Sequence, residues 1–126
     1  MGNKVMAKRV LTVDDSKTMR DMVSFTLKGA GFDVVEAEDG MKALSLLDKV
    51  NVDLVITDIN MPNMDGVTLV KHLRARAANR STPILILTTE GGEDKKAAGR
   101  TAGATGWIVK PFAPDKLLQV VAKVCP

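Results

Sequence analysis

Five short apolar runs cross this chain of 126 residues, and longer segments with a helical apolar pattern separate them. The runs occupy residues 9–13, 33–37, 52–57, 83–87 and 106–109. Strand candidates that alternate with helix candidates are typical of βαβ units, in which the strands run parallel. The alternation therefore predicts an α/β fold built on one parallel sheet.

The segments between the runs place apolar residues at the spacing of one helix face. A first helix is predicted after Asp15, and Gly29 and Gly31 close it. A second helix begins at a cap provided by Asp39 and ends near residues 50–51.

Three more helices are predicted in the second half of the chain. One follows the turn at 61–66 and continues to Ala77, and another spans residues 93–103. Four glycines lie in or beside 93–103, so we expect that helix to be short or mobile. Pro114 is well placed at the first position of the last helix.

Right-handed crossovers with helices on both faces give a doubly wound sheet of five parallel strands. The order 2-1-3-4-5, found in flavodoxin-like folds, is one of two common solutions. In this order strands 1 and 3 are neighbours, about 4.8 Å apart. Ligands of such sheets bind outside the carboxyl ends of the strands, so the residues that follow the strands form the candidate site.

Four of the five runs stop at polar side chains suited to phosphate or metal chemistry. These side chains are Asp14 and Asp15 after the first run, Asp58 after the third, Thr88 after the fourth and Lys110 after the fifth. Carboxylates suit Mg²⁺, which prefers oxygen ligands. Mg²⁺ and the lysine together would balance the charge of the three carboxylates, so the set predicts a metal and phosphate site.

Each of these residues also has an ordinary structural interpretation. An aspartate after a strand is often a cap or a turn residue, Thr88 could cap the next helix, and Lys110 could be a solvated lysine. The coincidence of four strand ends favours a site instead. Three other aspartates at predicted helix starts are interpreted as caps: Asp39, Asp65 and Asp94.

A carboxylate in such a site can act as a nucleophile toward phosphorus, while metal and lysine neutralise the developing charge and a hydroxyl holds one oxygen. Asp58 is the best candidate for the nucleophile because it leaves a central strand and enters a turn. The product would be an acyl phosphate, which hydrolyses readily. Such a modification is temporary and suits a switch.

At these positions the chain resembles the receiver domain of two-component response regulators, over nearly its whole length. Within that family it is most similar to the single-domain chemotaxis regulators of the CheY type. The resemblance rests on four motifs: residues 14–15, 58–66, 88–90 and 110–112. It implies that Asp58 accepts phosphate from a histidine kinase and that the protein is a regulatory phosphoacceptor, not an enzyme.

The resemblance also implies a metal site. Asp15, Asp58 and the backbone carbonyl of Asn60 would bind Mg²⁺ directly, and Asp14 would bind it through water. The residues that would contact the phosphoryl group are Thr88 and Lys110. No other cofactor is implied.

Phosphorylation in this family draws the switch hydroxyl inward, lets an aromatic residue of strand 5 turn in, and changes the surface of helix 4, strand 5 and helix 5. Here the hydroxyl would be Thr88 and the aromatic Trp107. Indole is bulkier than the family's tyrosine and lacks its hydroxyl, so its rotation or its hydrogen bond is expected to differ. Asn60, Thr89 and Glu90 occupy positions that tune dephosphorylation.

The resemblance implies a CheA-like kinase as a partner, a flagellar motor switch component as the target, and a phosphatase as a further partner. A phosphorelay intermediate or a phosphate sink remains an alternative. A haloacid dehalogenase phosphatase would need a second aspartate where Asn60 stands. A flavodoxin-like carrier would need a less acidic loop than residues 14–18, and aromatic residues to hold flavin.

The length predicts a single domain, and the resemblance implies one receiver domain over 1–126, with residues 1–7 as a flexible N-terminus. Cys125 is the only cysteine, so no internal disulfide can form and a cytoplasmic setting is expected. We also expect the protein to be a monomer. No apolar stretch is long enough for a membrane span. The net charge of +3 is well dispersed, and the basic stretch 71–80 is interpreted as a solvated helix face, not a nucleic-acid site.

Overall fold

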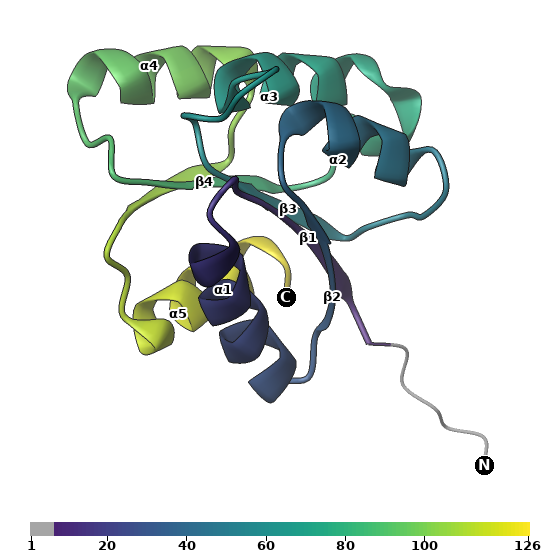
Figure 1. Ribbon diagram of the computed structural model, residues 1–126, viewed down its shortest axis with the longest axis vertical. Helices are drawn as coiled ribbons and strands as arrows, with labels where there is room; N and C mark the ends of the chain where they lie inside the picture. The colour runs from purple at the N-terminus through teal and green to yellow at the C-terminus, as the bar shows by residue number, and fades with distance from the viewer. Residues whose placement is uncertain (1–6) are drawn as a thin grey trace.

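The computed structural model describes residues 7–126 and contains one parallel sheet between two layers of helices (Figure 1). The strands are β1 (Arg9–Val13), β2 (Asp33–Ala37), β3 (Leu54–Thr57), β4 (Ile84–Thr88) and β5 (Gly106–Val109). Their order is β2-β1-β3-β4-β5, which confirms the predicted doubly wound fold. Of the N-terminal segment predicted to be flexible, residues 1–6 lie outside the described part of the chain.

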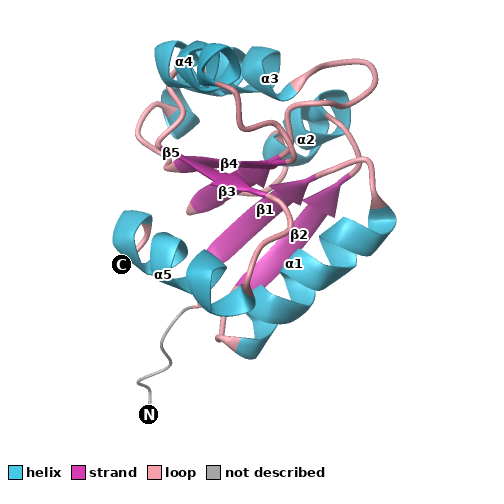
Figure 2. Ribbon diagram, turned by 90° about the vertical axis from the view of Figure 1, so that its left-hand side faces the viewer, coloured by secondary structure: helices cyan, strands magenta, loops and turns pink. Residues whose placement is uncertain are grey.

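The helices cover both faces of this sheet. They are α1 (Lys17–Gly29), α2 (Gly40–Leu47), α3 (Gly66–Ala75), α4 (Glu93–Ala102) and α5 (Pro114–Val124), with a short 3₁₀ helix, η1, at Ala77–Asn79. Figure 2 shows α1 and α5 on one face of the sheet and α2, α3 and α4 on the other. All neighbouring strands are parallel, so the carboxyl ends of the five strands share one edge.

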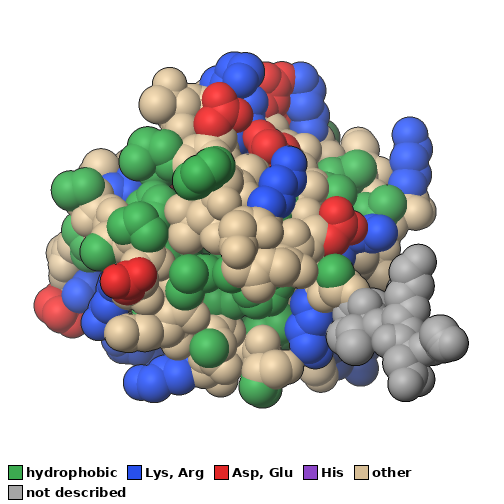
Figure 3. Space-filling view, turned by 90° about the horizontal axis from the view of Figure 1, so that it is seen from below, with side chains coloured by type: hydrophobic (Ala, Val, Ile, Leu, Met, Phe, Trp, Pro, Cys, Tyr) green, Lys and Arg blue, Asp and Glu red, His purple; other side chains and the backbone are tan. Residues whose placement is uncertain are grey.

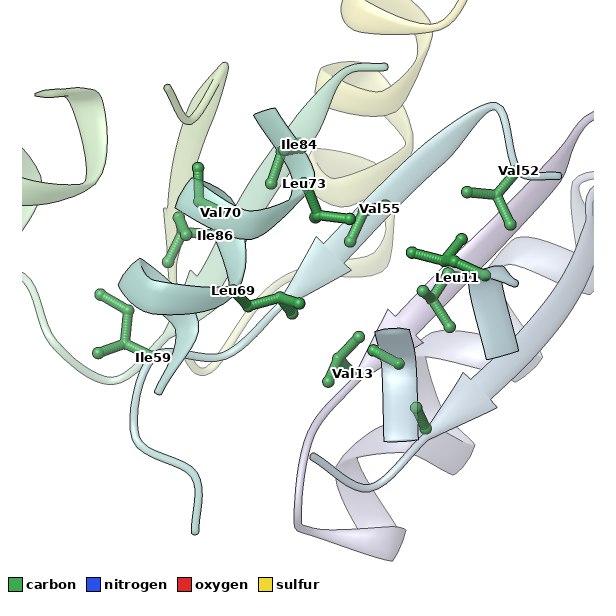
Figure 4. Packing of buried hydrophobic residues seen from close by; sticks show 13 residues of the cluster. Leu11, Val13, Val52, Val55, Ile59, Leu69, Val70, Leu73, Ile84 and Ile86 are labelled. Carbon is green, nitrogen blue, oxygen red and sulfur yellow. The ribbon is translucent and has the colours of Figure 1, made fainter. Parts of the chain in front are cut away.

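Two apolar clusters pack against the sheet, one on each face. Successive residues of a strand point to opposite faces, so Leu11 joins the cluster under α2 and α3 while Val10 joins the cluster under α1 and α5. Figure 4 shows Leu69 and Leu73 of α3 in the first of these clusters. Because both faces are buried, the register of the strands is strongly specified.

Two strand boundaries differ from those predicted. β3 begins at Leu54, two residues late, because the Asp53 carboxylate accepts a hydrogen bond from the Arg9 amide at 2.8 Å and takes the place of a regular strand contact. β4 begins after Pro83, which has no amide hydrogen, and extends to Thr88, whose carbonyl accepts the Lys110 amide.

Three helix boundaries also differ. α2 ends at Leu47 and not near residues 50–51, because the amides that follow bond in a tighter turn to Ser45 and Leu46. α3 ends at Ala75, where Arg76 adopts an extended conformation before η1. α4 ends at Ala102, one residue before its predicted end, so of the expectation that it is short or mobile the first part is wrong and the second stays a prediction.

The predicted caps are correct for α2 and α3 but wrong for α4. Asp39 and Asp65 each accept an amide hydrogen bond in the first turn of their helices. Asp94, by contrast, is the second residue of α4, and the cap position is Gly92, which has no side chain to offer. Asp94 instead places negative charge near the helix N-terminus, where the helix dipole favours it.

The basic stretch 71–80 is only partly a solvated face. Lys71 and His72 are exposed. Arg74 is half-buried and donates to the carbonyls of Thr82 at 2.6 Å and Gly103 at 3.0 Å, so it joins α3 to the C-terminal end of α4. Burial lowers the pKa of Arg74 below its ordinary value.

The surface shows mixed side-chain types. On the face seen in Figure 3, acidic, basic and hydrophobic side chains are interspersed, and neither sign of charge dominates. Within residues 7–126, no helix has the length and apolar character required to span a membrane.

Replacement of Asp65 by alanine tests the α3 cap. The Thr68 amide bonds to Asp65 at 2.7 Å, and this bond lowers the pKa of Asp65 more than burial raises it. We expect Asp65→Ala to lower the free energy of unfolding by about 1 kcal/mol at neutral pH. The native pKa lies below 3.8, so the loss will be complete above pH 3.8 and will vanish as pH falls through the native pKa.

Urea titrations at a series of pH values measure this loss. Asp94→Ala is the matched control, because it removes an exposed aspartate from a first helical turn without removing a cap. An equal loss in both variants, or a loss at Asp65 that persists in acid, would contradict the cap assignment.

Candidate functional site

The candidate site lies at the carboxyl edge of the sheet, where β1 and β3 end side by side. Val13 pairs with Thr57 across these strands, so the next residues, Asp14 and Asp58, leave the sheet together. One carboxylate oxygen from each of Asp14, Asp15 and Asp58 lies within 4.8 Å of the others. Asp14 and Asp58 are buried, whereas Asp15 is exposed. The structure thus brings the three predicted carboxylates together.

Lys110 follows β5 and reaches back to these carboxylates. Its Nζ donates to Oδ2 of Asp14 at 2.7 Å and to Oδ2 of Asp58 at 2.8 Å. The lysine side chain is only 9% exposed, so its interpretation as a solvated lysine is wrong. Burial alone would lower the pKa of Lys110, but its hydrogen bonds and charge interactions with the two carboxylates outweigh burial and raise that pKa.

Backbone amides hold the other oxygen of each buried carboxylate. The Ser16 amide donates to Oδ1 of Asp14 at 2.9 Å, and the Ile59 amide donates to Oδ1 of Asp58 at 2.6 Å. Arg20 of α1 adds a bond of 2.6 Å to the carbonyl oxygen of Asp14. Both carboxylates are therefore fixed in orientation by contacts on each side.

The donor set suits a small, hard dication. All three side chains offer carboxylate oxygens, the ligand type that Mg²⁺ prefers. Three carboxylates and the single Lys110 ammonium leave a formal charge of −2, which one Mg²⁺ would neutralise. An acidic triad of this kind is typical of the Mg²⁺ site in receiver domains.

Thr88 lies at the end of β4 and is fully buried. Its Oγ1 accepts a hydrogen bond of 3.3 Å from the Glu90 amide. The Glu90 carboxylate in turn accepts a 3.3 Å bond from the side-chain amide of Asn60, which is exposed. Glu90 therefore contacts both the end of β4 and the loop that follows Asp58, while Thr89 between them is exposed to solvent.

Trp107 lies in β5 and is half-buried against α4. Its Nε1 donates to the Glu90 carbonyl oxygen at 2.8 Å, so the indole does form a hydrogen bond without a phenolic hydroxyl. The ring packs on Gly99 so closely that a Cβ placed there would lie 2.8 Å from Cζ3. Glycine has a low helix propensity and so weakens α4, but at position 99 it makes room for the indole ring, which is larger than the family's tyrosine ring.

A hollow lies elsewhere on the surface. It has a volume of about 510 Å³, and its lining includes Arg20, Glu36 and Lys42 on the flank formed by α1, β2 and α2. It is open and lined by charges that pair with one another, such as Arg20 with Glu36. The carboxylates, not this hollow, hold the convergent polar groups expected of a site.

A doubly wound sheet with an acidic triad and a buried lysine at its carboxyl edge is typical of proteins that accept a phosphoryl group on an aspartate. Residues 10–122 match the family described as the response regulator receiver domain. The chain belongs to this family, whose members are regulatory phosphoacceptors and not classical enzymes. The resemblance inferred from the four motifs is confirmed.

Similar proteins include both chemotaxis and transcriptional regulators. The chemotaxis protein CheY4 of Vibrio cholerae has 47% sequence identity and a TM-score of 0.91, over 94% of this chain and 99% of that one. A signal receiver domain of a histidine kinase from Syntrophus aciditrophicus has 28% identity and a TM-score of 0.88, over 94% of this chain and 90% of that one.

A curated relative, the phosphate regulon transcriptional regulatory protein PhoB of Escherichia coli strain K12, is 37% identical over 94% of this chain. The chain spans about half the length of such relatives, 52% in this case.

Several contacts of the site were not predicted from the sequence. Arg20 lies on the inner side of α1, yet the helical pattern alone does not show that it reaches the Asp14 carbonyl. The contact between Trp107 and the Glu90 carbonyl involves a backbone group, which carries no sequence signal. The glycine at position 99, opposite a tryptophan, was a usable signal of close packing.

Replacement of Gly99 by alanine tests this packing. The added methyl group would meet the indole ring at 2.8 Å. We expect Gly99→Ala to shift the fluorescence maximum of Trp107, the only tryptophan, and to lower the free energy of unfolding by about 1–3 kcal/mol. The helix propensity of alanine offsets part of this loss.

Gly29→Ala is the matched control, because Gly29 is also helical and a Cβ there meets nothing within 4 Å. That variant is expected to keep the native fluorescence and to gain stability of up to about 1 kcal/mol. The packing assignment is wrong if both variants behave alike in fluorescence and in urea titrations.

Proposed function

We propose that Asp58 accepts a phosphoryl group from a phosphohistidine of a histidine kinase. The observation that carries the proposal is the contact of Lys110 with the buried Asp58 carboxylate, beside two further carboxylates. Asp15, Asp58 and the backbone carbonyl of Asn60 would hold Mg²⁺, and Asp14 would act through water. The metal would supply positive charge to the phosphoryl oxygens during transfer.

The reaction needs little covalent participation from the protein. One carboxylate oxygen of Asp58 attacks phosphorus, the phosphorus–nitrogen bond of the phosphohistidine breaks, and its electron pair remains on the imidazole nitrogen. Lys110 already lies 2.8 Å from Asp58 Oδ2, so its ammonium can follow the charge to the phosphoryl group. Water later attacks the acyl phosphate and releases inorganic phosphate.

The switch would act through the loop between β4 and α4. A phosphoryl group on Asp58 attracts the Thr88 hydroxyl, which in the present structure accepts the Glu90 amide. Loss of that bond would loosen Glu90, whose carbonyl holds the Trp107 indole. The covalent charge would thereby favour a second arrangement of the α4, β5 and α5 surface.

A chemotaxis role is the output that we favour. The likeness to CheY4 of Vibrio cholerae over nearly both chains supports it. By this proposal a cytoplasmic, monomeric single-domain receiver takes phosphate from a CheA-like kinase and binds a flagellar motor switch component. A role as a phosphorelay intermediate would instead require onward transfer of phosphate from Asp58 to a second histidine. A phosphate sink would require neither this onward transfer nor binding to a motor component.

Trp107 fluorescence tests the phosphoacceptor proposal. We expect Mg²⁺ with acetyl phosphate or beryllofluoride to change the emission of the wild-type protein, because the indole bonds to the β4–α4 loop. The Asp58→Asn variant is expected to show no such change. Asp21→Asn, at an exposed position of α1, is the control and is expected to respond like the wild type.

Two results would contradict the proposal: a wild-type protein that does not respond, and an Asp58→Asn variant that responds equally. Mass spectrometry after phosphotransfer from a phosphorylated CheA-like kinase then measures covalent modification at Asp58. Binding of a purified motor switch protein to the beryllofluoride complex, compared with phosphate transfer to a histidine phosphotransfer domain, separates the motor role from the relay role.

Thr89 is expected to lengthen the life of the phosphorylated state. Its side chain is exposed beside the site, between Thr88 and Glu90. The resemblance to the receiver family implies a smaller residue at this position. We expect Thr89→Ala to speed dephosphorylation several-fold by easing access of water to the acyl phosphate. The measurement is the decay of phosphorylated protein after removal of the donor, with Thr101→Ala on the exposed face of α4 as control.

A further inference from the structure

Asp39 joins the start of α2 to the loop that follows Asp58. Oδ1 of Asp39 accepts the Lys42 amide at 2.9 Å, which is the cap predicted for α2. Oδ2 of the same carboxylate accepts the side-chain amide of Asn63, also at 2.9 Å. Asp39 itself is 4% exposed, whereas Lys42 and Asn63 are exposed, so the two contacts are part-buried. The second contact is not needed to cap a helix.

The conformation of Asn63 suits this contact. Its φ of +69° lies in the left-handed region, which asparagine tolerates better than most residues. An ionised carboxylate only accepts hydrogen bonds, so the amide nitrogen of Asn63 must be the group that faces Asp39. The bonds from Lys42 and then from Asn63 lower the pKa of Asp39, because both favour the ionised carboxylate that accepts them.

The neighbouring residue adds an apolar contact between the same two segments. Met64 packs on Gly40, the first residue of α2, so closely that a Cβ at position 40 would lie 2.9 Å from the methionine sulfur. The tip of the β3–α3 loop is therefore seated on α2 by one polar and one apolar contact.

The base of that loop is also closed. The Gly66 amide donates to the Ile59 carbonyl at 2.8 Å, and the Ile59 amide donates to Asp58 at 2.6 Å. A Cβ at Gly66 would lie 2.1 Å from the Asp58 carbonyl oxygen, so only glycine fits there. Asn60 thus lies between a closed base and a tip that is docked on α2.

We propose that the contact between Asp39 and Asn63 positions the backbone of Asn60 for Mg²⁺. This inference rests on the proposed function, in which the Asn60 carbonyl is one of the metal ligands. With the tip undocked, the loop gains conformations in which that carbonyl is turned away, and the metal must select the competent one. Asp39 and Asn63 are positioning residues, because neither contacts the metal.

The Asn63→Gly variant isolates the contact. Glycine accepts a φ of +69° without strain, so the variant removes the amide and leaves the backbone conformation accessible. We expect its dissociation constant for Mg²⁺, measured by isothermal titration calorimetry with magnesium chloride, to rise about tenfold, as for other groups that orient metal ligands. Asn51→Gly is the matched control, an exposed asparagine before β3 at the opposite end of the sheet.

A rescue experiment separates positioning from general damage to the fold. If weak Mg²⁺ binding is the only defect of a variant, the variant regains the wild-type rate of phosphorylation by acetyl phosphate when Mg²⁺ is raised to saturation. A distorted site keeps a low rate at every Mg²⁺ concentration. We expect Asn63→Gly to regain the wild-type rate.

The Asp39→Ser variant provides a second, independent route. Serine retains one oxygen to cap α2 but has no second oxygen for Asn63. If both residues act through their mutual contact, the double variant Asp39→Ser/Asn63→Gly will bind Mg²⁺ no more weakly than the weaker of the two single variants.

The outcomes are distinguishable. Normal Mg²⁺ binding by Asn63→Gly, or additive losses in the double variant, would overturn the positioning role and leave the proposed function intact. Failure of the wild-type protein to bind Mg²⁺, or equal binding by Asp58→Asn, would overturn the proposed function and this inference with it.

Discussion

The ammonium of Lys110, held between Asp14 and Asp58, is the interaction on which the site depends. The two buried carboxylates have oxygens within 4.8 Å of each other and therefore repel. The lysine is the cation that the chain itself supplies. It comes from β5, which is not adjacent to β3 because β4 lies between them. The bridge therefore depends on the order of β1, β3, β4 and β5, so the chemistry of the site and the topology of the sheet support each other.

Much of the site was predictable because its main groups directly follow strands. Apolar runs that alternate with helical segments specify a parallel sheet, and the carboxyl ends of parallel strands meet at one edge. Asp14, Asp58 and Lys110 each occupy the first position after a strand, so their convergence depends on strand order and register alone. No detailed knowledge of loop conformation was needed to bring them together.

The remaining contacts depend on loops and backbone groups, and the sequence does not encode these in a local pattern. Asp39 was correctly predicted to be a cap, but its second oxygen binds Asn63, which is distant in the sequence. The glycines in and beside α4 led to the expectation of a short or mobile helix, but α4 spans Glu93–Ala102, where Trp107 packs on Gly99 and Gly103 caps the last turn. Tertiary contacts there outweigh intrinsic propensity.

Some groups of the site directly follow strands and others lie in a loop, and this difference affects how a switch could work. Asp58 and Lys110 are held by the sheet and cannot move far, whereas Thr88 stands at the point where β4 gives way to a loop. The Glu90 residue of that loop bonds to Asn60, Thr88 and Trp107 through three different groups. Under the proposed function, a charge added to Asp58 would act on an acceptor held by the sheet and on a loop with fewer constraints, so we expect the change of structure in the loop and not in the sheet.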